Sequence, residues 1–397
     1  MTKQADNTGA SSDSNMLGMD ALNLRSLVSR RSLFALAGGA AVLAACSSDS
    51  KSSETTAAAP TTTAKPKTTA TTDASTTTTV AETTTTAVAE TSTTVAAAPV
   101  QPLTGLPLQD PALLQQVALV VKVSNDPGAR PQTGLNEADI VFEAWGAGPT
   151  RFATIWHSQD RDFVGPIRSC REQDVNLVGE FNRAVFACSG GNPGNIDLLR
   201  NSDLLLITEG QGPGWELDPH RVRPHKTHAN TALLRSNAGP DRAGPTQQFH
   251  YRAVGEPAAA GDLMAGFDLQ IQSVFVQWRY DFGTNRYLRS QEKRPHLLAD
   301  GVQVSTDNVV LVALDYNPSH TDGRSPDGQT TGTNPCAVFS GGRMVLGSWS
   351  RSDRLEPFAL NDSNGGPILL TPGRTFIELA NSGSGSFAGN DTFIPVA

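Results

Sequence analysis

The sequence predicts an α+β fold, with a mixed α/β N-terminal domain over residues 101–255 and a mostly β C-terminal domain over residues 262–397. Two observations support this prediction. In the first domain, short apolar runs typical of buried strands alternate with helical patterns. In the second, strand patterns follow one another without an intervening helix. A segment rich in Gly, Pro and Ala at residues 255–261 separates the two.

Each element of the first domain rests on a local pattern. Val117–Val123 is a continuous apolar run, which is typical of a strand buried on both faces. The loop Gly146–Thr150 separates two strand patterns and predicts a hairpin. Leu177, Val178 and Phe181 have the spacing of one helix face. The predicted strands are 117–123, 139–145, 151–157, 184–188 and 204–208, and the predicted helices are 169–181 and 195–200. In the second domain the predicted strands are 271–279, 286–288, 309–314, 337–339, 343–349, 368–370 and 375–380.

Residues 1–46 resemble an export signal and are excluded from the fold prediction. Arg30 and Arg31 precede the apolar run Leu33–Ala45, which is too short to span a bilayer comfortably. Small residues then lead to Cys46, so the segment resembles a twin-arginine signal that ends in a bacterial lipobox. The resemblance implies cleavage before Cys46 and lipidation of this residue, with palmitate as an expected acyl chain. A signal for the general secretory route and an uncleaved anchor helix are the alternatives.

Residues 47–100 consist almost entirely of Thr, Ala, Ser and Pro. Such a segment buries too little apolar surface to offset the entropy of ordering, so we expect a disordered stalk between the membrane and the globule. The net charge of −8 excludes a generally basic surface for nucleic acid. No apolar run reaches 18 residues, which excludes a polytopic membrane protein.

Motifs throughout the globule resemble those of the YerB-like family of bacterial lipoproteins. They are Pro102–Gly105, Ala129–Leu135, Glu137–Val141, Thr150–Phe152 and Val164–Arg171 in the first domain, and Trp278–Arg279, Tyr287–Arg289, Asn308–Leu311, Gly347–Trp349 and Leu370–Thr375 in the second. The chain departs from the family pattern at Pro224–His228. The resemblance implies a lipoprotein with an N-terminal and a C-terminal YerB-like domain, and it implies no assigned biochemical activity.

Four arginines lie at predicted loop and strand ends of the first domain: Arg130, Arg151, Arg168 and Arg171. Guanidinium groups bind carboxylates or phosphates through two parallel hydrogen bonds, and the start of the predicted helix at residue 169 also favours an anion. These residues therefore predict a non-catalytic site for an anionic envelope ligand, such as peptidoglycan carboxylates or wall-polymer phosphates. Alternatively, the arginines hold loops together by pairing with Glu137, Asp139, Glu143, Glu172 or Asp174.

The alternative function is a cell-wall hydrolase that uses His225 as a general base together with Glu143 or Glu209. Asp139 and Glu143 are a poor catalytic pair by themselves, because residues four apart on a strand lie about 13 Å apart. A binding protein is favoured over an enzyme. Its predicted partners are peptidoglycan or an anionic wall polymer and, through Cys46, the extracytoplasmic face of the cell membrane, but not nucleic acid.

Three further features leave alternatives open. Asp218 shares a proline-containing loop with three histidines, which are His220, His225 and His228. These side chains either bind zinc or are exposed to solvent. No metal or cofactor is predicted. The glycine-rich segment 189–195 forms either a phosphate cradle or a tight turn. Cys170 and Cys188 form a disulfide or are small buried apolar residues.

Overall fold

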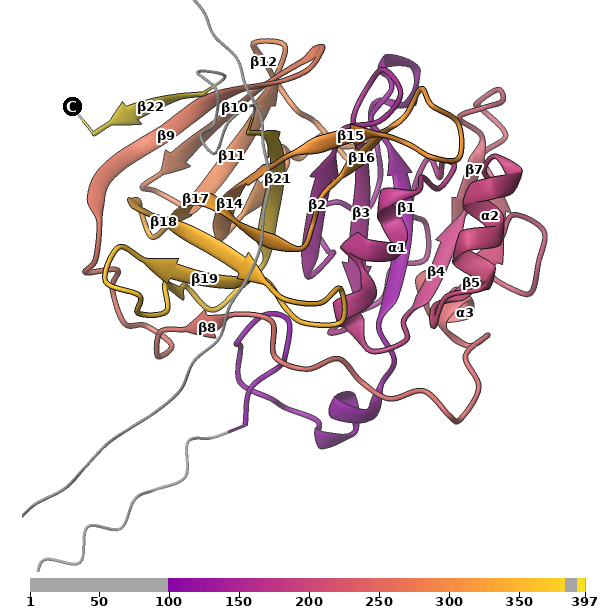
Figure 1. Cartoon of the computed structure of the whole chain (residues 1–397), viewed down its shortest axis with the longest axis horizontal. Helices are drawn as coiled ribbons and strands as arrows, with labels where there is room; N and C mark the ends of the chain where they lie inside the picture. The colour runs from indigo at the N-terminus through magenta and orange to yellow at the C-terminus, as the bar shows by residue number, and fades with distance from the viewer. Residues whose placement is uncertain (1–98, 383–390, 397) are drawn as a thin grey trace, which may run out of the picture. The chain divides into compact units, whose positions relative to one another are not determined.

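The computed structural model describes residues 99–382 and 391–396, which form one large mixed sheet with short helices on its faces (Figure 1). In spatial order its strands are β12 (Arg294–Pro295), β11 (Arg286–Gln291), β10 (Val274–Asp281), β9 (Asp262–Ile271), β18 (Arg343–Arg351), β17 (Gly332–Ser340), β14 (Asn308–Leu314), β21 (Thr375–Asn381), β2 (Ile140–Ala144), β3 (Arg151–Trp156), β1 (Leu119–Ser124), β4 (Val185–Cys188) and β5 (Leu205–Thr208). Three further strands pair with members of this order: β13 (Ser305–Thr306) with β11, β19 (Ala359–Asp362) with β18, and β22 (Asp391–Pro395) with β9. The expected export signal, and the expected stalk up to residue 98, lie outside the described residues.

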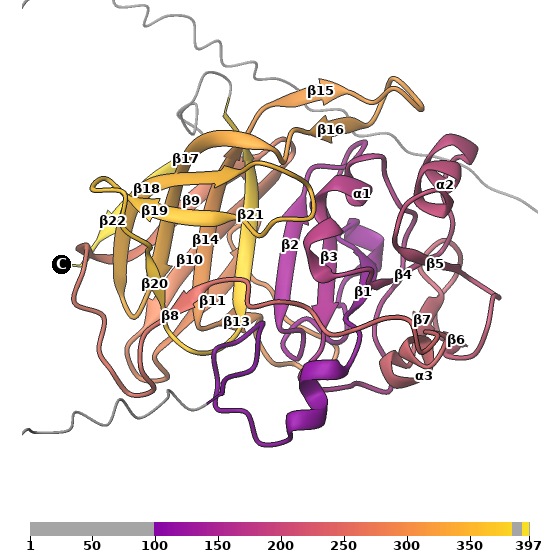
Figure 2. The same ribbon diagram turned by 60° about the horizontal axis from the view of Figure 1, so that its bottom comes forward.

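The remaining elements are short. Three two-stranded sheets are formed by β15 (Tyr316–Pro318) with β16 (Pro326–Gly328), β8 (His250–Tyr251) with β20 (Leu369–Leu370), and β6 (Trp215–Leu217) with β7 (Thr227–Ala229). The helices are α1 (Gln173–Leu177), α2 (Pro193–Arg200) and α3 (Thr231–Arg235), with 3₁₀ helices at Pro111–Gln115, Pro127–Ala129 and Gly179–Phe181. Figures 1 and 2 both show the β15–β16 hairpin beside α1, where the N–H of Gly328 donates to Gln173 Oε1 at 3.1 Å. Among the described residues, no helix has the length and hydrophobicity needed to cross a lipid bilayer.

The predicted α+β class is wrong, because the described chain is mostly β and lacks a mixed α/β first domain. That expectation depends largely on a helix over residues 169–181. The structure contains only α1 there, followed by the 3₁₀ helix Gly179–Phe181. Leu177 and Phe181 are buried, but two short turns bury them as well as one long helix does. Gly179 has low helix propensity, and Asn182 ends the turn with a left-handed φ of 51°.

Strands from both predicted domains belong to the same sheet. β21, from the second half of the chain, lies between β14 and β2 and pairs in parallel with both. In the second of these pairings Ile140 lies opposite Thr375 and Glu143 opposite Glu378. The predicted joint at residues 255–261 connects β8 to β9. The division into two domains stays a prediction, and any such domains share one continuous sheet.

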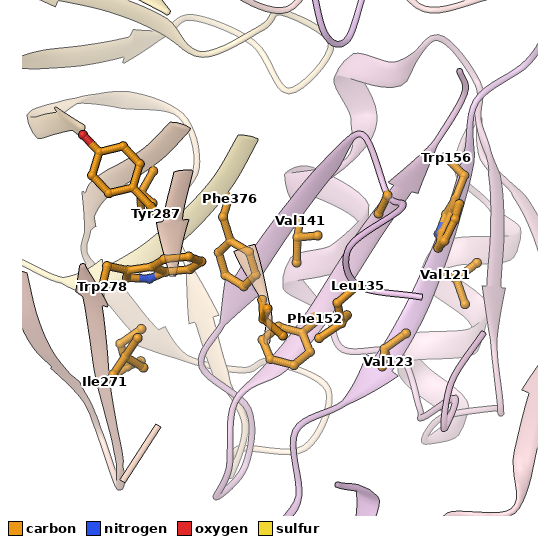
Figure 3. Close-up of a cluster of buried hydrophobic side chains, with 14 of the residues drawn as sticks. Val121, Val123, Leu135, Val141, Phe152, Trp156, Ile271, Trp278, Tyr287 and Phe376 are labelled. Carbon is orange, nitrogen blue, oxygen red and sulfur yellow. The ribbon is translucent and has the colours of Figure 1, made fainter. Parts of the chain in front are cut away.

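The central strands are buried on both faces, as the continuous apolar run of β1 predicts. Alternate residues of β1 face two different hydrophobic clusters, with Val121 in one and Val120 in the other. Figure 3 shows part of the first cluster, which contains side chains from both halves of the chain. At its centre Phe376 packs against Phe152 and Trp278, with ring centroids 5.8 and 4.9 Å apart. One core therefore joins the strands on either side of β21.

Candidate functional site

The end of strand β1 positions the arginines that the sequence singles out. Arg151, the first residue of β3, lies opposite Ser124, the last residue of β1. The backbone N–H of Arg168 donates to the carbonyl oxygen of Lys122 in β1 at 2.8 Å, and Arg171 follows three residues later. Arg130 lies in the loop after β1, and its side chain donates to a carbonyl oxygen of that loop at 3.5 Å. We call Arg130, Arg151, Arg168 and Arg171 the arginine cluster.

Asp126, also in the loop after β1, forms an ion pair with one member of the cluster. Its Oδ2 lies 2.7 Å from Arg168 Nη2 and 3.0 Å from Arg168 Nε. Partial burial favours the neutral carboxyl group, but the charge of Arg168, a hydrogen bond from Ser124 and the charge of Arg151 outweigh it and lower the pKa of Asp126. The Asp126 carboxylate therefore stays ionised and neutralises Arg168.

The other three arginines of the cluster form no ion pair with any residue in 99–382 or 391–396. Each has a buried guanidinium nitrogen without a hydrogen-bond partner in that part of the chain: Arg130 Nε, Arg151 Nη1 and Arg171 Nε. Arg151 is 8% exposed, and burial together with the charges of Arg171 and Arg168 lowers its pKa to about 10. At neutral pH Arg151 is still a cation. The charges of Asp126 and Asp174 act on it, but no ion pair within the described residues neutralises it.

None of the five acids considered as structural partners of these arginines forms an ion pair with them in the described chain. Their partners are Arg161 for Glu137, Ser158 for Asp139, Arg289 for Glu143, Ser319 for Glu172 and Lys122 for Asp174. One of these acids still contacts the cluster, because Asp174 Oδ2 accepts a hydrogen bond from the backbone N–H of Arg171 at 2.7 Å. Asp126, which the sequence patterns do not single out, is the acid that forms an ion pair with the cluster.

A buried ion pair that was not predicted from the sequence lies close to the cluster. Arg289 of β11 and Glu143 of β2 are both fully buried, and Arg289 Nη2 lies 2.6 Å from Glu143 Oε2. Glu378 of β21 lies opposite Glu143. Burial and the charge of Glu143 raise the pKa of Glu378 well above its ordinary value, although Arg289 opposes this. We infer that Glu378 is protonated at neutral pH, and that the ion pair of this network joins Glu143 and Arg289.

A strand pattern could have revealed this pair. Tyr287, Arg289 and Gln291 alternate with more exposed residues along β11 and all point to the buried side. An arginine in phase with a buried tyrosine indicates a buried charge, which requires a partner.

Two fully buried amides connect this ion pair to the loop of the arginine cluster. Asn125 Nδ2 donates to Glu143 Oε1 at 3.0 Å. Gln132 Oε1 lies 2.9 Å from His296 Nε2, and the other ring nitrogen of His296 lies 2.6 Å from Arg289 Nη1. Asn125 and Gln132 lie at the two ends of this loop. The buried network therefore holds Asp126 and Arg130, which lie between them, in place.

His225 lies beside the cluster, but the structure does not bring it together with either acid of the hydrolase alternative. A Cβ at Gly128 would lie 3.0 Å from His225 Nε2. Burial and the charge of Arg168 lower the pKa of His225, so the ring is neutral at pH 7. Glu143 is enclosed in the buried network, and Glu209 binds Arg223 and a threonine hydroxyl, each at 2.8 Å. Among the described residues, no carboxylate contacts the His225 ring.

The other features of the sequence take structural roles. His228 is buried and stacks on Phe163, with ring centroids 4.2 Å apart, while His220 is exposed. In the glycine-rich segment Asn192 Oδ1 accepts a hydrogen bond from the N–H of Asn195 at 2.8 Å and caps α2. The tip of the β15–β16 hairpin contacts this cap through Thr321. The thiols Cys170, Cys188 and Cys336 are free and buried.

Comparisons with known proteins cover most of the described chain. The N-terminal domain of a protein family of unknown function (DUF3048) matches residues 103–243, and the C-terminal domain of this family matches residues 267–377. The Bacillus subtilis (strain 168) protein named Putative lipoprotein YerB is 28% identical over 291 residues, which are 70% of this chain and 85% of the relative. The crystal structure of the YerB protein from Bacillus subtilis has the same fold, with a TM-score of 0.64 and 23% identity over 74% of this chain and 99% of that one.

Proposed function

Because the chain belongs to the family of unknown function DUF3048, with both of its domains, we propose that it is a lipid-anchored protein of the bacterial cell envelope that binds an anionic envelope ligand at the arginine cluster. The lipoprotein name of the Bacillus subtilis relative supports the anchoring, and Cys46 is the residue that we expect to carry the lipid. The proposed activity is binding and not catalysis, since His225 contacts neither Glu143 nor Glu209.

One observation carries the proposed binding site. Asp126 is the single acid that pairs with the arginine cluster in residues 99–382 and 391–396, so three guanidinium groups retain unused donors. A buried donor without a partner costs about 1–3 kcal/mol. The oxygen atoms of a carboxylate or a phosphate would supply partners and neutralise the charge at the same time. Peptidoglycan stem peptides and phosphate-containing wall polymers both present such oxygen atoms.

Calorimetric titration of the full chain in detergent tests the binding site. The probes are a muropeptide with free carboxylates and a glycerol-phosphate oligomer. We expect one of them to bind, and salt to weaken the binding. Arg171→Gln should reduce the affinity about tenfold or more, because a hydrogen bond to a charged group contributes about 1.5–3 kcal/mol.

The matched control is Arg200→Gln, which removes an exposed arginine at the end of α2 and should leave the affinity unchanged. The proposed site is wrong if neither probe binds, or if Arg200→Gln weakens the binding as much as Arg171→Gln does.

Cell fractionation tests the anchoring separately. We expect the full chain in the membrane fraction, extractable by detergent, and Cys46→Ser outside that fraction because it lacks the thiol that carries the lipid. Equal membrane association of the two proteins would contradict lipidation at Cys46.

A further inference from the structure

A second cluster of polar side chains lies where the β15–β16 hairpin meets α1. Glu172 immediately precedes α1, His320 lies in the hairpin tip, and Asp327 is the central residue of β16. One carboxylate oxygen of each acid and one imidazole nitrogen lie within 4.8 Å of one another. Glu172 Oε1 and His320 Nδ1 are 3.1 Å apart. Three potential metal ligands therefore converge from the two halves of the chain.

Asp327 supplies an independent observation. Its side chain is buried, with the residue 6% exposed, and its Oδ1 has no hydrogen-bond partner in the described chain. Its Oδ2 accepts one hydrogen bond, from Gln329 Nε2 at 3.1 Å. Burial and the negative charge of Glu172 raise the pKa of Asp327. A cation bound between the two carboxylates would satisfy the free oxygen and remove their repulsion.

We propose that Glu172, His320 and Asp327 bind a divalent transition-metal ion, and that Zn²⁺ fits the donors best. One imidazole nitrogen and two carboxylate oxygens are ligands that zinc takes in proteins. Tetrahedral bonds of about 2.0 Å place neighbouring ligand atoms about 3.3 Å apart, close to the separation between Glu172 and His320. The imidazole disfavours Ca²⁺ and Mg²⁺, which prefer oxygen ligands. His320 is 82% exposed, so solvent can complete the coordination.

The hairpin tip already orients Glu172 for this role. Ser319 Oγ and the N–H of Thr321 donate to Glu172 Oε2 at 2.6 and 3.2 Å, which leaves Oε1 directed at His320. The ion would replace the contact between this carboxylate and the imidazole, and the ring proton would reside on Nε2. The bound ion would link the β15–β16 hairpin to the start of α1, next to Arg171. The metal site is independent of the function proposed above.

Metal titration of the full chain in detergent, after removal of metals with a chelator, tests the site. Zn²⁺ binding is measured by competition with a chromophoric chelator, and Co²⁺ is used in parallel because its visible absorption reports the ligand geometry. We expect one Zn²⁺ per chain at this site. His320→Gln and Asp327→Asn should each weaken the binding at least tenfold and abolish the cobalt spectrum, while circular dichroism shows that both variants are folded.

The matched control is His250→Gln, which removes another exposed histidine, in β8, and should bind Zn²⁺ like the unchanged chain. The proposal is overturned if the unchanged chain binds no Zn²⁺, or if both site variants bind as tightly as it does. Tighter binding of Ca²⁺ than of Zn²⁺ would also overturn it, since the imidazole would then not be a ligand.

Discussion

Among single residues, Arg289 is the one on which the buried network most depends. Its guanidinium lies 2.6 Å from Glu143 and donates to Gln291 at 2.8 Å, without access to solvent. Removing one partner of such a pair leaves a buried charge uncompensated, which costs about 3–5 kcal/mol. The network therefore stabilises the fold only when both Arg289 and Glu143 are present. Substitutions of its acids can test which of them carries the charge.

Glu378→Gln and Glu143→Gln should differ in their effect on stability. Since Glu378 is protonated in the folded protein, replacing it with an amide should cause no loss of stability at pH 7. Glu143→Gln removes the charge that faces Arg289 and should lower the free energy of unfolding by about 3 kcal/mol or more. Urea denaturation measures both values, and equal losses would contradict the assignment of the proton to Glu378.

The pH dependence of the same measurement gives a second check. In the unfolded chain Glu378 ionises near its ordinary pKa of 4.5, whereas the folded protein keeps the proton to a higher pH. Within this window the folded state binds more protons than the unfolded state, so the stability that Glu378 contributes falls as pH rises. Glu378→Gln lacks this titration. Its stability relative to the unchanged chain should rise from about pH 5 to about pH 7, and a constant difference would mean that Glu378 is ionised when folded.

The residues of the arginine cluster are accessible to sequence analysis because they lie at the ends of strongly predicted strands. Arg151 and Arg168 meet at the end of β1 through local hairpin and loop connections. Glu143, Arg289 and Glu378 meet through pairings between distant segments, and a sequence pattern does not specify which strands become neighbours. The same limit hides Asp327 and the approach of its carboxylate to Glu172.

At the scale of elements, strands buried on both faces are predicted best. The run Val117–Val123 corresponds to β1, and the predicted hairpin corresponds to β2 and β3. Strand β9 is largely missed, because the sequence predicts a strand only from residue 271 and β9 contains Gly266 in its middle. A glycine inside a strand weakens the pattern and often marks a close approach of backbones.

Gly266→Ala should destabilise β9 strongly. Gly266 has a φ of +148°, and an added Cβ would lie 1.9 Å from the carbonyl oxygen of Trp278 in the neighbouring strand. The control is Gly255→Ala, where φ is +82° but no atom lies within 4 Å of the added Cβ. The control should cost about 1–2 kcal/mol, for its backbone conformation alone. Thermal or urea unfolding should show a clearly larger loss of stability for Gly266→Ala than for Gly255→Ala. Equal losses would mean that β9 and β10 can move apart at Gly266 without a cost in free energy.

At the scale of the whole molecule, the predicted boundary at residues 255–261 does not interrupt the sheet. A stretch rich in Gly, Pro and Ala indicates a connection without regular structure. It carries no information on whether the segments that it connects pair elsewhere. β21 pairs with β2, and Phe376 packs on Phe152, so the described chain has a continuous sheet and core across the two predicted domains.

We therefore expect the two halves to unfold together. Val185 in β4 and Val276 in β10 are fully buried in the same hydrophobic cluster, one in each half. Val185→Ala and Val276→Ala should each destabilise the protein by about 1–3 kcal/mol. In a cooperative structure, amide hydrogen exchange in both β4 and β10 should then accelerate equally in either variant, because the slowest exchange occurs through global opening. If Val276→Ala accelerated exchange in β10 and left β4 unchanged, the halves would open independently and the shared sheet would not couple them.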